Sequence, residues 1–592
     1  MDPRSEYVRR LEHRRSALKM EERRHKQIGI LRLGVFVIAA VLGWFALFHS
    51  RTFSAWWLAA PAVSFVALVV MHSRVQARRR RLERAAAYYE RGLSRIEGEW
   101  QGNGEQGRRF LNPHHPYAQD LDVFGEGSLF ELLCATRTRA GEEKLASWLG
   151  CPAGAEDIAA RQASVAELRP KLDLREELAV LGTEVRAGMH EDALAAWGSF
   201  PAVLKPGPTR TIAVILAALT LVSIAIWIAW GDHRWFLLML LAEILFTFRM
   251  RRAIRRVVDA VEQPGQDLAL FSLLLGRLEQ ETFRSQRLLE LRSRLESDGQ
   301  PPSCRIARLN RLIVLLDSRR NLLFAPVAAI LLWETQFAYA IETWRRHNGP
   351  GIAGWIAAVA ELEALSSLAG YAYEHPDDPF PEISESSVFS GRALGHPLIA
   401  ENRCVRNDVH LGPDLNVLVV SGSNMSGKST LLRTVGVNAV LALAGAPVRA
   451  ASLRLSPLSL GASIRTVDSL QEGSSRFYAE ITRLRQLVDL AEGSPPLLFL
   501  LDELLHGTNS HDRRIGAEAV VKGLLRRGAI GLLTTHDLAL AKIADDLAPR
   551  AANVHFQDHI ENGRIHFDYR LHPGVVEKSN ALELMRSIGL EV

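Results

Sequence analysis

The fold class that the sequence predicts is an α/β domain at the C-terminus, preceded by an all-α region that contains two transmembrane helical hairpins. Two observations support this prediction. Long apolar runs occur in two pairs within the first 250 residues, whereas short strand-like runs followed by Gly-rich, acidic or His-containing turns lie after residue 415. Runs approaching 20 apolar residues are long enough to cross a bilayer, and short apolar runs between turns are typical of buried parallel strands.

The composition is that of a large chain with an ordinary overall balance. It has 592 residues, of which 48% are apolar and 23% charged, with a formal net charge of +5. This length excludes a disulfide-stapled mini-protein and a disordered tail. The four cysteines form no CxxC pair, which indicates neither a zinc site nor a disulfide framework and favours a reducing cytosolic setting. The net charge is too weak to indicate nucleic-acid binding by itself.

The first pair of apolar runs follows a basic segment. The first 26 residues hold nine Lys and Arg against five Asp and Glu, and residues 33–49 and 53–71 then carry none of these four types. Six Arg and one Glu follow in residues 74–84. Since Arg clusters stay cytoplasmic and short charge-poor links are translocated, we expect a hairpin with its tip outside and both ends in the cytoplasm. A signal peptide is not expected, because two runs occur back to back without a small-residue cleavage site.

The second pair repeats this pattern. Residues 211–230 and 235–248 are apolar, and five Arg follow in residues 249–256. The shorter run contains Glu243, which would have to face a partner helix or reach the interface. Together the two pairs predict four spans in an inner or plasma membrane, with the N-terminus and the C-terminal domain cytoplasmic. The alternative for both pairs is a pair of buried helices in a soluble bundle.

A third apolar segment, residues 321–333, is only thirteen residues long and contains Pro326. Because this is too short for a span, we expect a buried core helix there.

The C-terminal region contains a phosphate-binding motif. Residues 416–420 predict a buried strand, and Gly422 to Ser429 directly after it fits GxxxxGK[ST] without a mismatch. The glycines let successive backbone N–H groups point at phosphates, Lys428 reaches the β- and γ-phosphates, and the Ser429 hydroxyl ligates Mg²⁺. The sequence thus predicts a P-loop domain that binds ATP and Mg²⁺. The predicted contact residues are Gly422, Ser423, Asn424, Met425, Ser426, Gly427, Lys428, Ser429 and Thr430.

Two further strand ends supply the predicted catalytic groups. Residues 496–501 lead into Asp502 and Glu503, and residues 529–534 lead to His536. An Asp beside a P-loop is the usual second holder of Mg²⁺, and a neighbouring Glu can polarise the attacking water. His536 is expected within reach of the γ-phosphate. The order of loop, acid pair and His is that of an ABC-type ATPase, with Lys428, Glu503 and His536 as catalytic residues.

These motifs resemble those of the MutS DNA mismatch-repair ATPases. The similar segments are SGSNMSGKST, Asp502-Glu503 followed by Gly507-Thr508, Thr535-His536, residues 552–555 and residues 473–480. The resemblance implies a homodimer in which Ser475 of one subunit reaches the nucleotide of the other. It also implies that His555 packs near the base. Looser similarity at residues 121–149 and 355–368 implies the family's helical core and lever domain.

The departures from the family concern DNA. The N-terminal mismatch-reading domain of the family has no counterpart, and the second hairpin interrupts the stretch that would carry the DNA clamp. Three outputs therefore stay open: DNA binding, mechanical action on a protein partner of unknown identity, and a transporter-like role. The last is disfavoured, because four spans with one acidic residue offer little of a polar pathway.

The predicted domain organisation has eight parts. They are a basic cytoplasmic segment (1–32), hairpin 1 (33–72), a basic linker helix (73–109), the first part of the core domain (110–204), hairpin 2 (211–248), a helical arm (249–300), the second part of the core domain (301–390) and the ATPase domain (391–592).

Overall fold

The computed structural model describes residues 2–48, 55–205, 207–296, 299–423, 425–465, 476–505, 509–536, 538–561 and 564–576. The chain forms two compact units. One contains Met1–Cys134, Ala146–Val180 and Ser366–Val592, and the other contains Ala135–Leu145 and Leu181–Leu365.

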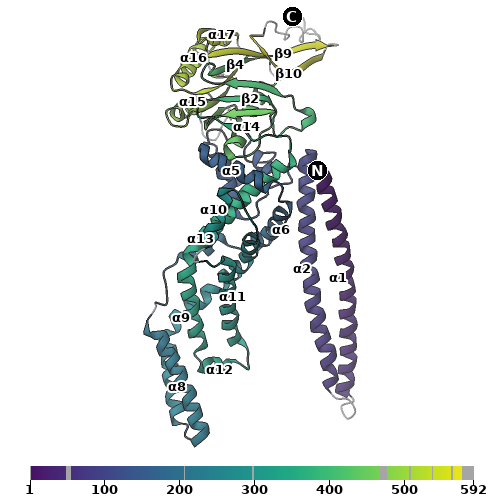
Figure 1. Ribbon diagram of the computed structural model, residues 1–592, viewed down its shortest axis with the longest axis vertical. Helices are drawn as coiled ribbons and strands as arrows, with labels where there is room; N and C mark the ends of the chain where they lie inside the picture. Colours follow the sequence, from purple (N-terminus) through teal and green to yellow (C-terminus); the bar gives the residue numbers. More distant parts are fainter. Residues whose placement is uncertain are drawn as a thin grey trace. The chain divides into compact units, whose positions relative to one another are not determined.

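The C-terminal part of the first unit is built on a six-stranded sheet in the order β10-β9-β4-β8-β7-β6. The strands are β4 (Val417–Ser421), β6 (Ser459–Ser463), β7 (Leu497–Asp502), β8 (Ile530–Thr535), β9 (Ala551–Glu561) and β10 (Arg564–Pro573). All neighbours pair in parallel except β9 and β10. The helices of this domain are α14 (Lys428–Ala444), α15 (Arg476–Ala491), α16 (Ser510–Arg526) and α17 (Leu538–Asp546), and Figure 1 shows them with the sheet.

The predicted strands at 416–420, 496–501 and 529–534 are confirmed as β4, β7 and β8, each displaced by one residue. Every residue of β4 and β8 is buried, as expected for parallel strands covered on both faces. Ser421 pairs in register with both Thr535 and His555, and Asp502 pairs with Thr534. The register therefore brings the ends of four strands to one edge of the sheet.

A second, four-stranded sheet takes three strands from before β4 and its fourth from between α14 and β6. Its order is β1-β5-β2-β3, with β1 (Glu382–Ile383), β2 (Phe389–Leu394), β3 (Asn407–Leu411) and β5 (Ser452–Leu455). Short helices α3 (Leu129–Leu133) and α5 (Ala155–Leu168) also belong to this unit, and α5 contacts α14.

The N-terminal hairpin consists of two long helices, α1 (Pro3–Phe48) and α2 (Ala59–Glu97), which run side by side (Figure 1). α1 continues without a break from a basic segment into an apolar run, and α2 continues from an apolar run into a basic segment. The apolar segments are exposed, with Phe36, Trp44 and Val66 each at about 60% of their accessible surface. The link at residues 50–52 lies outside the described residues.

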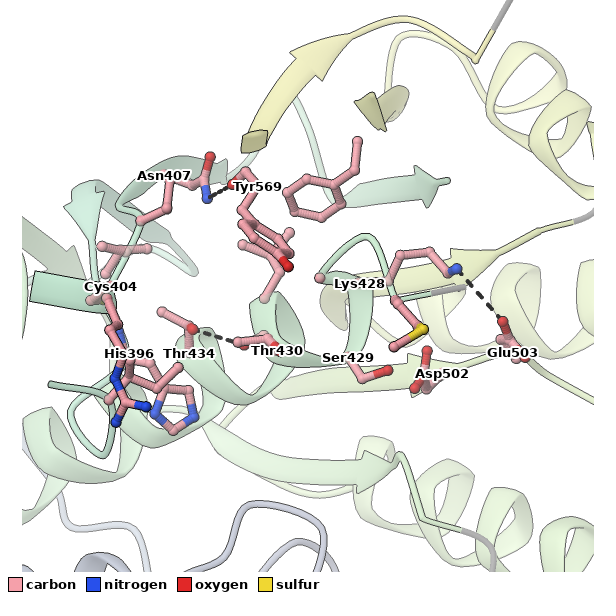
Figure 2. Close-up of a pocket in the computed structure, with 18 residues that line it drawn as sticks. His396, Cys404, Asn407, Lys428, Ser429, Thr430, Thr434, Asp502, Glu503 and Tyr569 are labelled. Carbon is pink, nitrogen blue, oxygen red and sulfur yellow. Dashed lines mark hydrogen bonds and ion pairs between the residues drawn. The ribbon is translucent and has the colours of Figure 1, made fainter. Parts of the chain in front are cut away.

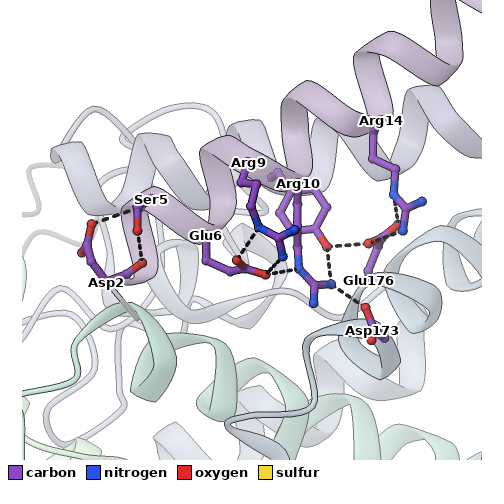
Figure 3. A network of polar contacts seen from close by, with 9 residues as sticks. Asp2, Ser5, Glu6, Arg9, Arg10, Arg14, Asp173 and Glu176 are labelled. Carbon is purple, nitrogen blue, oxygen red and sulfur yellow. Dashed lines mark hydrogen bonds and ion pairs between the residues drawn. The ribbon is translucent and has the colours of Figure 1, made fainter.

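The polar end of this hairpin packs on α6 (Leu172–Gly188) through a network of charged groups (Figure 3). Arg10 contacts Asp173 at 2.5 Å and Arg14 contacts Glu176 at 2.9 Å, while the Tyr89 hydroxyl also donates to Glu176. Several paired charges at one contact fix its geometry better than a single surface ion pair does. The hairpin base is thereby attached to the same unit that carries the P-loop domain.

Nearby, Glu374 anchors the hairpin base from the end of α13 (Trp333–Glu374). Its fully buried carboxylate accepts hydrogen bonds from the Tyr7 hydroxyl at 3.2 Å and from Arg95 Nε at 2.7 Å.

The second unit is helical. Its helices are α7 (Glu191–Ser199), α8 (Pro208–Trp230), α9 (Arg234–Glu279), α10 (Gln286–Leu295), α11 (Pro302–Asp317), α12 (Ala325–Ile330) and most of α13, while α4 (Arg139–Gly150) and α6 each lie partly in both units. In the hairpin of α8 and α9, Glu243 is buried and accepts a hydrogen bond from Thr220 Oγ1 at 2.6 Å. The acid thus faces the partner helix, which was one of the two outcomes expected for it.

Length and composition qualify four helical stretches among the described residues as candidate membrane spans: Pro3–Phe45, Trp56–Glu97, Pro208–Trp230 and Trp333–Glu374. The first three coincide with predicted spans. The apolar part of Trp333–Glu374 is 78% buried inside the protein, which fits a core helix rather than a span. The run at 235–248 begins the long helix α9, which is not among the four candidates.

The prediction of a buried core helix at residues 321–333 is wrong. Only Ala325–Ile330 forms a helix of its own there, Trp333 already begins α13, and Leu322 and Leu323 are 88% and 89% exposed. Two local features explain the difference. Pro326 fits only the first turn of a helix, and the Asn321 side chain accepts the Leu323 N–H at 3.0 Å, which stabilises a turn before it.

Candidate nucleotide-binding site

A cavity of about 680 Å³ lies at the C-terminal ends of the parallel strands (Figure 2). Crevices at this edge of an open α/β sheet are the usual place for ligands. The P-loop and the acid pair form one wall, with Met425, Gly427, Lys428, Ser429, Thr430, Asp502 and Glu503. The other wall comes from the four-stranded sheet and β10, and includes His396, Cys404, Asn407 and Tyr569.

The loop between β4 and α14 has the geometry that its glycines predict. Gly422 and Gly427 have φ values of +154° and +105°, and a Cβ on Gly422 would lie 2.7 Å from Ser426 Oγ. Only glycine adopts such angles without strain. Ser426 Oγ is buried and has no hydrogen-bond partner among the described residues. A buried hydroxyl without a partner is unusual in a folded protein.

Lys428 begins α14 and turns back over the loop. Its Nζ donates to the carbonyl oxygens of Gly422 and Ser423, both at 2.9 Å, and lies 3.7 Å from Glu503 Oε1. Burial lowers the pKa of Lys428, and the carboxylates of Glu503 and Asp502 oppose this shift. A buried ammonium group held at a loop of backbone N–H groups is suited to an anionic ligand.

Glu503 lies close to both of the other predicted catalytic residues. Its Oε1 lies 3.2 Å from His536 Nδ1 as well as 3.7 Å from Lys428 Nζ. Its backbone has a φ of +48°, which is rare for a residue other than glycine. Such conformations are retained mainly where the surrounding structure and a function require them. The structure therefore brings Lys428, Glu503 and His536 together.

Asp502 and Ser429 both line the cavity, and Figure 2 shows the Ser429 hydroxyl on the side of Asp502, with the Lys428 ammonium group directed at Glu503. Thr534 Oγ1 donates to Asp502 Oδ1 and accepts the Glu503 N–H at 3.1 Å, so one hydroxyl orients both acids. Hydroxyl and carboxylate oxygens are hard ligands of the kind that Mg²⁺ prefers, with phosphate oxygens and water completing its shell. These two residues fit the predicted metal role.

The remaining predicted contacts divide into two groups. His555 lies on β9, where its Nδ1 contacts the Gly574 carbonyl at 3.1 Å, and it does not line the cavity. Gly422, Ser423 and Ser426 are described but are not lining residues either, since they lie on the loop behind it. Asn424, Ser475 and Gly507-Thr508 lie outside the described residues.

Sequence reasoning missed the opposite wall. Tyr569 comes from β10, with its ring 3.2 Å from the position of a Cβ on Gly427, and Asn407 Nδ2 donates to its carbonyl at 2.9 Å. No motif marks either residue. Only the antiparallel pairing of β10 with β9 returns the chain to the P-loop.

His396 is the titratable group of this wall with the clearest shift. Burial, with a smaller effect of Arg433, lowers its pKa to about 4. The Leu398 N–H donates to its Nδ1 at 3.2 Å, which requires this nitrogen to be unprotonated and agrees with a neutral ring.

Acidification from pH 7 to pH 5 is therefore expected to lower the free energy of unfolding by about 2 kcal/mol through His396. The sign follows from the proton count. Between the unfolded pKa of about 6.5 and the folded pKa of about 4, the unfolded chain binds more protons, so stability falls as pH falls. Thermal denaturation of the detergent-solubilised chain and of His396→Gln at both pH values measures this. If both proteins lost the same free energy of unfolding between pH 7 and pH 5, this loss could not be assigned to His396.

A Gly-rich loop after β4, an acid pair after β7 and a His after β8 define a P-loop nucleotide-binding domain of the ATPase class. Comparison with known families identifies it further: the model of MutS domain V matches residues 418–591, so this region of the chain belongs to the MutS family. The described strands and helices of residues 418–576 are therefore those of a MutS domain V.

Known relatives agree. The DNA mismatch repair protein MutS of Shouchella clausii is 31% identical over 240 residues, which are 39% of this chain and 27% of that protein. The MutS of Myxococcus xanthus is 33% identical over 250 residues, 41% of this chain and 28% of that protein. The protein named endonuclease MutS2 of Thermus thermophilus is 34% identical over 203 residues, 33% of this chain and 25% of that protein. The chain thus spans about a quarter of the length of these relatives.

Proposed function

We propose that the chain is a membrane-anchored ATPase of the MutS type, which binds and hydrolyses ATP as a homodimer and couples this cycle to DNA. The observation that supports the ATPase activity is that Glu503, which lines the cavity together with Lys428, lies close to both Lys428 and His536. Membership of the C-terminal region in the MutS family supports the same activity.

In this proposal the loop backbone and Lys428 hold the triphosphate. Ser429 and Asp502 would hold Mg²⁺, which when bound neutralises phosphate charge during phosphoryl transfer. Glu503 orients and polarises the attacking water. His536 senses the γ-phosphate, and because it directly follows β8, it couples the presence of that phosphate to this strand. Asn424 and Ser475, the latter from the partner subunit, and His555 near the base complete the proposed contacts by resemblance to the family.

The membrane part rests on exposed apolar surface. Soluble monomers rarely expose apolar patches beyond a few hundred Å². On α8 and α9 the side chains of Ile228 and Phe248 are 81% and 75% exposed, and the apolar halves of α1 and α2 are exposed along their length. Lipid would cover all of these surfaces. The Arg clusters after each hairpin support a cytoplasmic location of the ATPase domain in this proposal.

A binding assay on the full chain in detergent tests the proposal. We expect ATP hydrolysis, together with DNA binding that weakens steeply as salt rises, because phosphate contacts release counterions. ATP hydrolysis without DNA binding at low salt would overturn the DNA part and favour mechanical action on a protein partner. Absence of hydrolysis would overturn the ATPase, and extraction of the chain from membranes by alkaline carbonate would overturn the anchor.

A further inference from the structure

The second unit contains a cavity that the ATPase does not use. It has a volume of about 710 Å³ and lies between α9, the residues before α12 and the beginning of α13. One wall is the stretch of α9 from Leu240 to Arg255, and the facing wall includes Ala325, Ala328 and Ala329. Trp333 closes one side, with its indole N–H donating to the Leu315 carbonyl at 2.6 Å.

The α9 wall is apolar at one end and cationic at the other. Leu240, Ile244 and Phe248 follow one another at intervals of four residues, so they form one stripe, and Arg251 and Arg255 continue it. At 1.5 Å per residue, the stripe from Leu240 to Arg255 is about 22 Å long. Leu240, Ile244 and Phe248 belong to the proposed span at residues 235–248. Arg251 and Arg255 belong to the Arg cluster at residues 249–256, just beyond that span.

The arginine side chains at the cationic end of the stripe are available to an anionic ligand. Arg251 and Arg255 are exposed and form no ion pair within the described part of the chain. Arg320 has only distant partners, Asp317 at 3.6 Å and Glu262 at 3.8 Å. The two acids of the cavity do not neutralise these groups, since Glu334 pairs with Arg319 at 3.1 Å and Glu243 accepts the Thr220 hydroxyl.

The chain next to the cavity is apolar and exposed. Leu322 and Leu323, whose side chains are almost fully exposed, directly precede α12, and Val327 of α12 is 46% exposed. Exposed apolar side chains beside an apolar-to-cationic stripe are suited to contact with lipid.

We propose that this cavity binds a membrane phospholipid with an anionic headgroup. An acyl chain lies along Leu240, Ile244 and Phe248 against the alanines of α12, and the headgroup phosphate lies at Arg251 and Arg255. Charge complementarity selects the headgroup, because guanidinium groups bind phosphate by paired hydrogen bonds. The inference rests on the proposed membrane insertion of this hairpin.

The test uses the full chain and two matched double variants. In native mass spectrometry of protein solubilised from mixed vesicles, we expect phosphatidylglycerol to be retained over phosphatidylcholine. Arg251→Gln/Arg255→Gln is expected to lower this preference about 10-fold. Arg252→Gln/Arg256→Gln has the same charge change and spacing on the same helix but lies outside the cavity, and it is expected to keep the preference. Unchanged ATP hydrolysis confirms that all three proteins are folded.

Three outcomes would overturn the proposal. An equal loss in both double variants would show general surface charge rather than a site. Displacement of the lipid by millimolar glycerol 1-phosphate would show a site for free phosphate esters. Retention of the chain in carbonate-washed membranes without any headgroup preference would overturn the lipid site alone, whereas release of the chain would overturn the membrane proposal itself.

Discussion

Replacing Glu503 by glutamine is expected to slow ATP hydrolysis at least about 100-fold while ATP still binds. The carboxylate lies 3.2 Å from His536 Nδ1 and 3.7 Å from Lys428 Nζ, at the cavity wall that also carries Asp502. Glutamine keeps the shape of the side chain but cannot polarise a water molecule as an anion does. Steady-state kcat and the Kd of a fluorescent ATP analogue measure the two effects separately.

The same geometry predicts the direction of the change in binding. Glu503 neutralises part of the Lys428 charge, so its removal leaves that charge available to phosphate, and the Kd for ATP should stay equal or decrease. Glu492→Gln is a suitable control, because this exposed acid pairs with Arg527 outside the cavity. Glu503→Ala should give the same separation of binding from turnover. Full turnover in either Glu503 variant would remove this residue from the mechanism.

The sequence predicts those parts of the site that depend on local pattern. Parallel strands buried on both faces are continuous apolar runs, and for this reason β4, β7 and β8 could be placed within one residue. Because such strands end at one edge of the sheet, residues that directly follow them must meet there. The proximity of Glu503 and His536 follows from this rule, and Lys428 joins them through the P-loop that connects β4 to α14.

Contacts between distant segments leave no such pattern. Tyr569 reaches the P-loop only because β10 folds back on β9, and its neighbour Asn407 comes from another sheet. The base of the first hairpin is similar, since Arg10 and Asp173 pair across 163 positions of the sequence. Each of these residues is an ordinary polar or aromatic residue in its own segment, so only tertiary packing reveals its role.

The segment at 321–333 shows a different reason for failure. Its apolar content favoured a buried helix. However, an apolar segment can be buried either in a protein core or in lipid, and its composition does not distinguish the two. A proline in the first helical turn and two almost fully exposed leucines mark a short helix beside an open cavity. The same hydrophobicity then supports an interfacial role, which the proposed lipid site uses.

Replacing Lys428 by alanine is expected to raise the Kd for ATP at least about 100-fold, which corresponds to about 2.7 kcal/mol, and to abolish hydrolysis. Lys428 is buried, and the carbonyls of Gly422 and Ser423 hold its ammonium group over the loop. Since burial lowers its pKa, the charged form is destabilised there unless anions compensate it. A triphosphate provides this compensation, and alanine cannot make the contact. Isothermal titration with ATP and Mg²⁺ measures the loss.

Thermal stability distinguishes lost binding from a lost fold. A ligand that binds only the folded state raises Tm by an amount that grows with the ratio of its concentration to its Kd, so ATP should raise the Tm of the unmodified chain and of Lys522→Ala, but not that of Lys428→Ala. Lys522 is half exposed on α16 and pairs with Glu518, so its loss removes one lysine without touching the cavity. The Tm without ATP is expected to change little in Lys428→Ala, because the lost contacts with two carbonyl oxygens and Glu503 offset the relief of no longer burying an ammonium group. An ATP-dependent rise in Lys428→Ala that matches the control would show that the P-loop lysine does not hold phosphate, and the nucleotide site would have to be sought elsewhere.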